Sequence, residues 1–252
     1  MSISYAEIKL STDQLNVLSE IKKDTYIMAL HFLNKLYNYK TDSGEKLQLA
    51  TSESLTCGLI MSTLVDIPFG ANLKYGCFGV YDTDAKRVFN HVTVDDVYTH
   101  KCASEMAIGV LKNSNATISI SVTGNAKPSS EHINRLGEVF IGIAGYKSDT
   151  EIIYITKSIN ACVETQNKKF KDICFKWYSK IANDPTKKIL NDRKDTLLIS
   201  LLIRYYTTLM AYYFCMEFIS TTKLCVPDFI KKQKKDNDYI DKNNNHINIP
   251  SI

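Results

Sequence analysis

The chain has 252 residues, of which 44% are hydrophobic and 23% are charged, and its formal net charge is +4. These values are ordinary for a soluble globular protein, and the length suits one domain with a substantial core. Much of the positive charge lies late in the chain, in residues 168–171, 187–188 and 231–235. A mild charge placed in this way does not by itself indicate a nucleic-acid partner, and we expect none.

The seven cysteines are scattered along the chain. None forms a Cys-x-x-Cys pair, and no His/Cys cluster has the spacing of zinc ligands. We therefore expect no metal site, and we expect a reducing, cytoplasmic location. The first ten residues mix polar and apolar side chains, so they do not predict a signal peptide.

Apolar residues from Leu15 to Leu36 recur mostly at three- and four-residue steps, which predicts a long amphipathic helix capped by Ser11, Thr12 or Asp13. Beyond this helix, we predict strands over residues 46–50, 75–81, 117–122, 137–144 and 151–156, and helices over 58–66 and 103–113. The alternation predicts an α/β fold. We expect a three-layer sandwich in which a mixed, mainly parallel sheet is flanked by helices, in a single domain with a helical insertion.

The chain divides into five predicted parts. Residues 1–45 are an N-terminal helical segment, 46–156 the α/β core, 157–190 a helical insertion, 191–230 the C-terminal helix of the core, and 231–252 a disordered polar tail.

The stretch 195–219 is apolar and about as long as a membrane span. Arg204 lies near its middle, where an arginine costs roughly 2.5–3.5 kcal/mol on insertion scales. We therefore expect a helix buried in the core or in the interface of a homo-oligomer. A membrane anchor is the minor alternative.

A serine lies where the first predicted strand gives way to a helix. The segment Thr-Ser-Glu-Ser-Leu-Thr-Cys-Gly occupies residues 51–58, with Ser54 in its middle. Backbone N–H groups at a helix start favour an anion or a developing oxyanion. The alternative is that Ser54 only caps the helix, and Thr51, Ser52 and Thr56 compete for either role.

Tyr81 and Lys86 follow the strand predicted over residues 75–81. A lysine can serve as a base near neutral pH if burial or a neighbouring positive charge lowers its pKa by about 3 units. Arg87 or Arg193 is a candidate for that charge. Tyr81 can relay a proton, although both side chains also suit ordinary positions, on the surface for Lys86 and on an apolar strand face for Tyr81.

Two of these segments resemble known motifs. Residues 51–58 are similar to T-A-E-S-C-T-G-G, and residues 81–86, Tyr-Asp-Thr-Asp-Ala-Lys, are similar to Y-S-N-E-A-K. Both motifs belong to the CinA C-terminal domain family of nicotinamide-nucleotide amidases. Further matches follow in the same order: residues 105–112 to E-M-A-x-G-A-x-K, 123–128 to S-G-I-A-G-P, 134–139 to K-P-V-G-T-V, and 191–193 to G-D-R.

This resemblance implies an amidohydrolase that converts the carboxamide of nicotinamide mononucleotide, or of a related small amide, to the acid and ammonia without a cofactor. By the resemblance, Ser54 is the nucleophile, Lys86 its base and Tyr81 a proton relay. The nucleotide substrate is expected to contact Thr56, Gly58, Thr123, Gly124, Lys127 and Arg193.

The chain departs from the family pattern at several of these positions. Asn125 and Lys127 replace an isoleucine and a glycine of the nucleotide loop, and Cys57 replaces a glycine close to Ser54. These departures leave the substrate open. They also keep a second hypothesis in view: a catalytically inactive nucleotide-binding or interaction module with the same fold.

Overall fold

The computed structural model describes residues 9–127, 133–182 and 193–233. In this part of the chain, five strands form a sheet in the order β2-β1-β3-β4-β5. Strand β1 (Leu49–Glu53) pairs in parallel with β2 (Lys74–Gly79) and β3 (Ile118–Gly124). Strand β4 (Glu138–Tyr146) pairs antiparallel with β3 and with β5 (Ile152–Asn160). The predicted mixed sheet is confirmed, and its four pairings divide equally between parallel and antiparallel.

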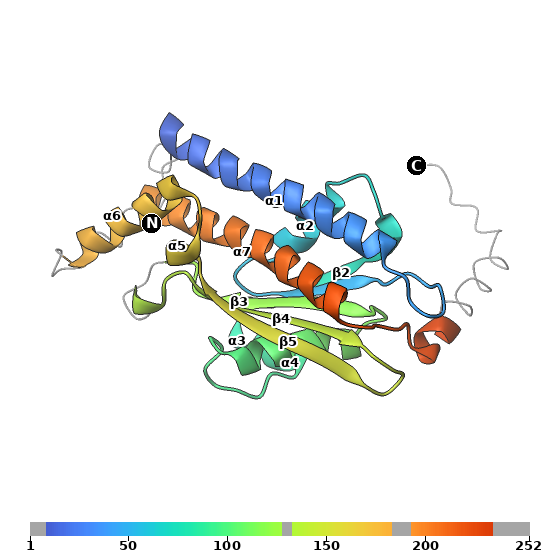
Figure 1. Ribbon diagram of the computed structural model, residues 1–252. Coiled ribbons are helices and arrows are strands. Elements are labelled where there is room, and N and C mark those ends of the chain that lie inside the picture. The colour runs from blue at the N-terminus through green and yellow to red at the C-terminus, as the bar shows by residue number, and fades with distance from the viewer. Residues whose placement is uncertain (1–8, 128–132, 183–192, 234–252) are drawn as a thin grey trace, which may run out of the picture.

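Helices cover both faces of the sheet, so the predicted α/β layering is confirmed (Figure 1). Helices α1 (Thr12–Asn38) and α7 (Arg193–Thr221) lie side by side on one face. Helix α4 (His100–Lys112) packs on the other face, with α3 (Thr83–Asn90) against it. Helix α2 (Leu59–Val65) contacts α1, α7 and the strands β1 and β2. Short 3-10 helices occur at Ala71–Leu73 and Ile133–Arg135.

The long N-terminal helix begins as predicted. Ser11 is its cap, and Ser11 and Gln14 form a reciprocal pair of hydrogen bonds between side chain and backbone. The strand predicted over residues 46–50 instead runs from Leu49 to Glu53, and all five of its residues are buried. The predicted strand ended too early because Thr51, Ser52 and Glu53 are polar. Their side chains are buried with hydrogen-bond partners of their own, so the strand continues through them.

Strand β5 extends to Asn160, past the predicted end at residue 156, and so includes the first residues of the segment 157–190 that was predicted as an insertion. This segment contains the helices α5 (Ala161–Glu164) and α6 (Lys168–Ala182), so its helical character is confirmed. Residues 183–190 of the segment and residues 234–252 of the predicted tail lie outside the described residues. The division into five parts stays a prediction.

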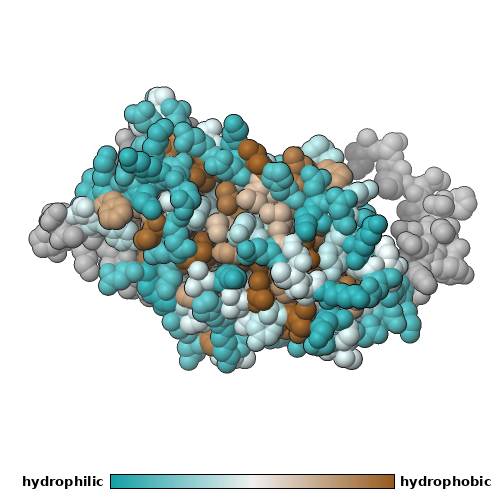
Figure 2. All heavy atoms as spheres, in the orientation of Figure 1, coloured by the Kyte–Doolittle hydropathy of each residue, from teal (hydrophilic) through white to brown (hydrophobic). Residues whose placement is uncertain are grey.

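Helix α7 has the length and composition of a membrane span over Asp195–Thr221, and about 56% of its most apolar window is buried within the protein. Seven of its apolar side chains are fully enclosed: Leu198, Ile199, Leu202, Ile203, Ala211, Tyr212 and Cys215. This burial favours the interpretation as a core helix. Figure 2 shows that the face over α1 and α7 is largely hydrophilic, with hydrophobic side chains in scattered groups.

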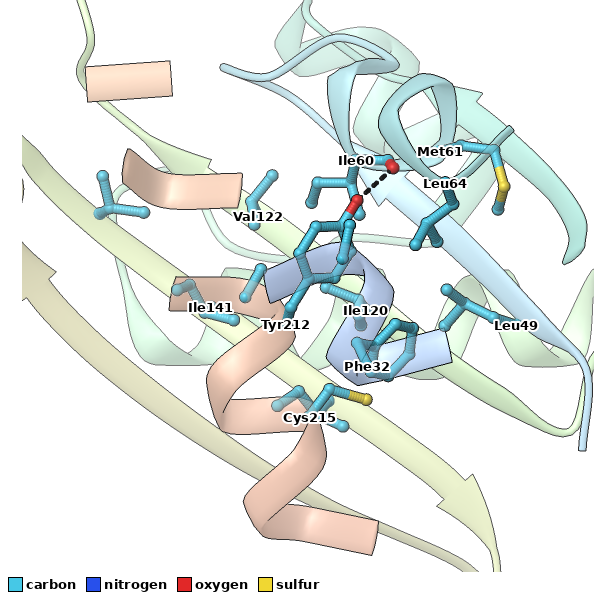
Figure 3. Packing of buried hydrophobic residues seen from close by; sticks show 14 of the residues in the cluster. Phe32, Leu49, Ile60, Met61, Leu64, Ile120, Val122, Ile141, Tyr212 and Cys215 are labelled. Atoms are coloured by element: carbon cyan, nitrogen blue, oxygen red, sulfur yellow. Dashed lines mark hydrogen bonds between the residues drawn. The ribbon is translucent and has the colours of Figure 1, made fainter. Parts of the chain in front are cut away.

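Tyr212 of α7 joins the helical layer to α2. Its ring stacks on Phe32 of α1 at 5.3 Å between centroids, and its hydroxyl donates to the carbonyl oxygen of Ile60 at 2.5 Å (Figure 3). Burial raises the pKa of the Tyr212 hydroxyl well above its ordinary value, so this group stays a donor. Helix α2, and with it the turn that precedes it, is therefore fixed from both α1 and α7.

Candidate active site

The turn between β1 and α2 is built around the buried carboxylate of Glu53. This side chain is 0% exposed. It accepts backbone N–H groups from Gly58 at 2.8 Å, Ile60 at 3.1 Å and Met61 at 3.1 Å, and the Thr51 hydroxyl at 2.8 Å. Paired N–H donors of this kind compensate a buried carboxylate, and the negative charge suits the positive end of a helix. Glu53 thus folds the chain back on itself directly after the strand.

This arrangement corrects part of the sequence interpretation. The N–H groups at the start of α2 serve Glu53, so they are not available to an external anion. Ser54 donates its own N–H to the carbonyl of Val122 at 3.0 Å. The backbone N–H groups of Leu55 and Thr56 have no acceptor among the described residues. These two groups, rather than the helix start, are the candidates for an oxyanion site.

The turn needs left-handed backbone at two consecutive residues. Cys57 has φ +46° and Gly58 has φ +97°. A glycine adopts this conformation without strain, whereas a residue with a Cβ is strained there. The conformation therefore explains why the family motif has glycine where this chain has Cys57.

Lys86 is held inside the protein rather than on its surface. It lies on α3, a helix capped by the Asp82 side chain, and only 2% of Lys86 is exposed. Its Nζ donates to the carbonyl oxygens of Tyr81 at 2.9 Å and Asp82 at 3.4 Å. No carboxylate among the described residues lies within 4.0 Å of this amine. Neutral carbonyls stabilise an ammonium group less than a carboxylate would.

Burial lowers the pKa of the Lys86 amine, and Cys102 and Asp82 offset only part of that effect. The cause is therefore desolvation and not a neighbouring cation. Arg87 is paired with Asp95 at 3.1 Å on the surface. The side chain of Arg193 lies outside the described residues.

A cavity of about 130 Å³ brings most of the predicted residues together. It is lined by Ser54, Leu55, Tyr81, Thr83, Lys86, Val97, Tyr98, Gly124, Asn125, Ala126, Lys127 and Arg204. Ser54 is nearly buried at 6% exposed, whereas Tyr81 is 61% exposed and lies towards the outside. The candidate nucleophile and the candidate base thus share one enclosed space, with Tyr81 at its margin.

Three predicted contacts do not line the cavity. Thr56 is buried and its hydroxyl has no hydrogen-bond partner among the described residues. Gly58 gives its N–H to Glu53, and the Thr123 hydroxyl donates to the carbonyl of Val97 at 2.8 Å. Gly124 does line the cavity, but close packing also requires a glycine there. A Cβ on Gly124 would lie 2.4 Å from the carbonyl oxygen of Glu138 on β4.

Arg204 was not predicted to be part of the site. It lies in the middle of α7 and lines the cavity, and its Nε is buried without a hydrogen-bond partner among the described residues. From the sequence, this arginine was considered only as a cost of membrane insertion. An arginine near the middle of the apolar stretch 195–219 was the signal for a functional position, because burying a charge is costly. Lys127 and Arg204 make the lining cationic, and no carboxylate is among the lining residues in the described part of the chain.

Tyr98 was also missed, and Arg135 holds it in place. The guanidinium lies 5.0 Å from the centroid of the Tyr98 ring and donates to the Tyr98 carbonyl at 2.6 Å. The same group pairs with Asp96 at 3.1 Å and with Glu138 at 2.5 Å. Burial is the main cause that raises the pKa of the Tyr98 hydroxyl. Arg135 thereby fixes the loop that closes one side of the cavity.

The family model described as "CinA C-terminal domain" matches residues 34–169, which include Ser54, Lys86 and the β3–β4 loop. The chain belongs to the CinA C-terminal domain family. It is 37% identical over 131 residues to a CinA-like protein of Chlorobium limicola, an alignment that covers 49% of this chain and 30% of that protein. It is 30% identical over 100 residues to the protein MG115 homolog of Mycoplasma pneumoniae, an alignment that covers 38% of this chain and 64% of that protein.

These alignments span less than two thirds of each relative, and about a third of the Chlorobium protein. Among solved structures, the competence/damage inducible protein CihA of Agrobacterium tumefaciens superposes with a TM-score of 0.51 at 20% identity, covering 77% of this chain and 94% of that one. This likeness shows that the two chains share a fold. Among the described residues, no group of three or more His, Cys, Asp or Glu side chains is arranged to hold a metal ion.

Proposed function

We propose that this CinA-family chain is an amidohydrolase in which Ser54 is the nucleophile and Lys86 its base. One observation carries the proposal: Ser54 and a buried lysine with a lowered pKa line the same cavity. A serine hydroxyl needs a neutral amine as its proton acceptor. Burial lowers the pKa of the Lys86 amine, so this amine becomes neutral at a lower pH than an exposed lysine does.

In the proposed mechanism, the Lys86 amine takes the proton of the Ser54 hydroxyl as Ser54 Oγ attacks the amide carbon. The backbone N–H group of Leu55, which lines the cavity, stabilises the oxyanion of the tetrahedral intermediate, and the N–H group of Thr56 follows it in the turn. The protonated Lys86 then returns the proton to the departing amine, and ammonia leaves. Water attacks the resulting ester with Lys86 again as base, which frees the acid and Ser54. Tyr81, whose carbonyl accepts from Lys86, holds that amine on the cavity side of α3.

The proposed substrate is a small amide that carries a phosphate, with nicotinamide mononucleotide as the first candidate. The cationic lining by Lys127 and Arg204 favours an anion, and a guanidinium binds phosphate with two parallel hydrogen bonds. The cavity of about 130 Å³ is smaller than the roughly 300–1,000 Å³ typical of ligand pockets. Only part of a nucleotide fits inside it, so the remainder would extend past the exposed Tyr81 and Lys127.

The test is ammonia release from nicotinamide mononucleotide, nicotinamide riboside and free nicotinamide. We expect turnover of the phosphorylated compound alone, and its loss in Ser54→Ala. Ser220→Ala is the matched control, because Ser220 is an exposed serine near the end of α7 whose hydroxyl bonds only within its own helix. Ammonia release that survives in Ser54→Ala would overturn the proposal.

The small cavity and Lys127 at its mouth favour a second candidate, a nucleotide-binding module without turnover. Thermal stabilisation of the wild-type protein by nicotinamide mononucleotide, without ammonia release, would support this candidate. Arg204→Gln separates phosphate recognition from chemistry in either case. It is expected to weaken binding of the phosphorylated compound about tenfold or more, because the loss of one charged hydrogen bond costs about 1.5–3 kcal/mol.

A further inference from the structure

Two cysteines lie against the turn that carries Ser54. Of the seven free cysteines, four are buried, Cys225 is partly buried, and only Cys57 and Cys77 are exposed. Cys57 lies in the left-handed turn between Ser54 and α2, and Cys77 lies in the middle of β2. The catalytic scheme uses neither thiol.

Both cysteines are placed by Glu53. The Cys77 Sγ donates to Glu53 Oε1 at 3.5 Å, and Gly58, the neighbour of Cys57, donates its N–H to Glu53 Oε2 at 2.8 Å. The Cys57 Sγ lies 3.9 Å from the position that a Cβ on Gly79 would occupy. Residues 77 and 79 are two apart on one strand, so they face the same side of the sheet. The thiol of Cys57 therefore lies over the face of β2 from which Cys77 projects.

We propose that Cys57 and Cys77 are a reversible oxidation site, which closes to a disulfide when the protein meets a low-molecular-weight disulfide such as oxidised glutathione. The Cys57 thiolate attacks one sulfur of glutathione disulfide, forms a mixed disulfide and releases one glutathione thiolate. The Cys77 sulfur then attacks Cys57 Sγ and displaces the second glutathione. Two protein thiols are oxidised to one disulfide, the oxidant is reduced to two thiols, and the protons pass to the released glutathione.

The order of these steps follows from the surroundings of the two thiols. Cys77 is exposed as a residue, but its sulfur points to the buried carboxylate of Glu53. Desolvation of the sulfur there and the charge of Glu53 raise the pKa of Cys77 to about 12, so this thiol is a poor first attacker. Cys57 is exposed in a turn and meets the oxidant first.

The disulfide would alter the turn that holds the candidate oxyanion donors. Cys77 could no longer donate to Glu53, and Cys57 would be tied to β2 one residue after Thr56. If the proposed hydrolase activity holds, on which this part of the inference rests, oxidation lowers ammonia release and a reductant restores it.

The experiment exposes the native protein to glutathione buffers of increasing oxidised fraction, quenches it with an alkylating agent and maps the thiols by mass spectrometry. We expect a peptide cross-link between Cys57 and Cys77 in the wild type. Cys77→Ser should stop at a glutathione adduct on Cys57, and Cys57→Ser should form no cross-link. Cys225→Ser is the matched control and should behave as wild type.

A disulfide needs Cα atoms within about 4.4–6.8 Å, so the cross-link is a strict test of the geometry. A wild-type protein that accumulates only the glutathione adduct, or that links Cys57 to another cysteine, would overturn the proposal. The map does not depend on turnover, so its failure is distinct from a failure of the hydrolase proposal. A confirmed cross-link in a protein without amidase activity would retain the oxidation site and remove only its effect on catalysis.

Discussion

Replacing Glu53 with glutamine should destabilise the protein more than any surface carboxylate change. The carboxylate receives Gly58 and Ile60 on one oxygen, and Met61, Thr51 and Cys77 on the other. A glutamine has a single acceptor oxygen, so its NH₂ group must face at least one of these buried N–H groups. One buried donor without a partner costs about 1–3 kcal/mol, and the remaining bonds lose the reinforcement of the charge. We expect a loss of about 2–4 kcal/mol in the free energy of unfolding.

Urea unfolding measures this loss as a shift in midpoint at constant m-value. Glu151→Gln is the control, because Glu151 forms a half-exposed surface pair with Lys147 at 3.1 Å, and such pairs contribute about 0–1 kcal/mol. A Glu53→Gln protein within about 0.5 kcal/mol of the wild type would refute the claim that the carboxylate organises the turn. That result would also mean that the hydrogen bonds of Glu53 do not fix the position of Ser54.

Three further changes probe other contacts. Gly109→Ala places a Cβ 2.3 Å from the Asn90 carbonyl oxygen and should lower the free energy of unfolding by about 1–3 kcal/mol. Gly76→Ala is the control, because the space around its Cβ is open, and it should lower this free energy much less. Equal losses in the two variants would refute the claim that Gly109 is required by close packing. Cys57→Gly removes the Cβ from a residue in left-handed conformation and should raise the free energy of unfolding by about 0.5–1 kcal/mol. A decrease would contradict the inferred backbone strain at Cys57. Lys86→Met tests how the stability depends on pH. The pKa of Lys86 is lowered in the folded protein, so between that pKa and about 10.4 the unfolded chain binds a proton that the folded protein does not. The free energy of unfolding of the wild type, relative to that of Lys86→Met, should therefore rise with pH across this window. A difference that falls with pH would contradict the burial of a neutral amine.

The elements with strong periodicity were predictable from the sequence, and the polar ones were not. Helix α7 and strand β3 were predicted to within a few residues because their apolar pattern reflects their burial. Helix α3 was not predicted. Its eight residues are mostly polar, and it is defined by the Asp82 cap and by packing on α4, neither of which produces an apolar pattern in so short a stretch.

The candidate site was predictable where a motif marks it. Ser54 and Lys86 were found from short segments whose order resembles a family, and the structure places both at one cavity. Glu53 and Arg204 were missed because their roles depend on partners distant in sequence. Arg204 lies 150 residues after Ser54 and reaches the cavity only because α7 crosses the sheet face. Glu53 was given no role of its own within the segment 51–58, since nothing in the local sequence shows that its charge is enclosed.

The proposed catalysis depends on the protonation state of the Lys86 amine. Direct NMR detection of the Lys86 side chain during a pH titration, assigned by comparison with Lys86→Met, measures that state without any assumption about substrate. We predict that the Lys86 amine loses its proton at a pH below the ordinary lysine value of about 10.4, because burial disfavours its charged form. A Lys86 amine that titrates with the surface lysines, near the ordinary pKa of about 10.4, would contradict the proposed base.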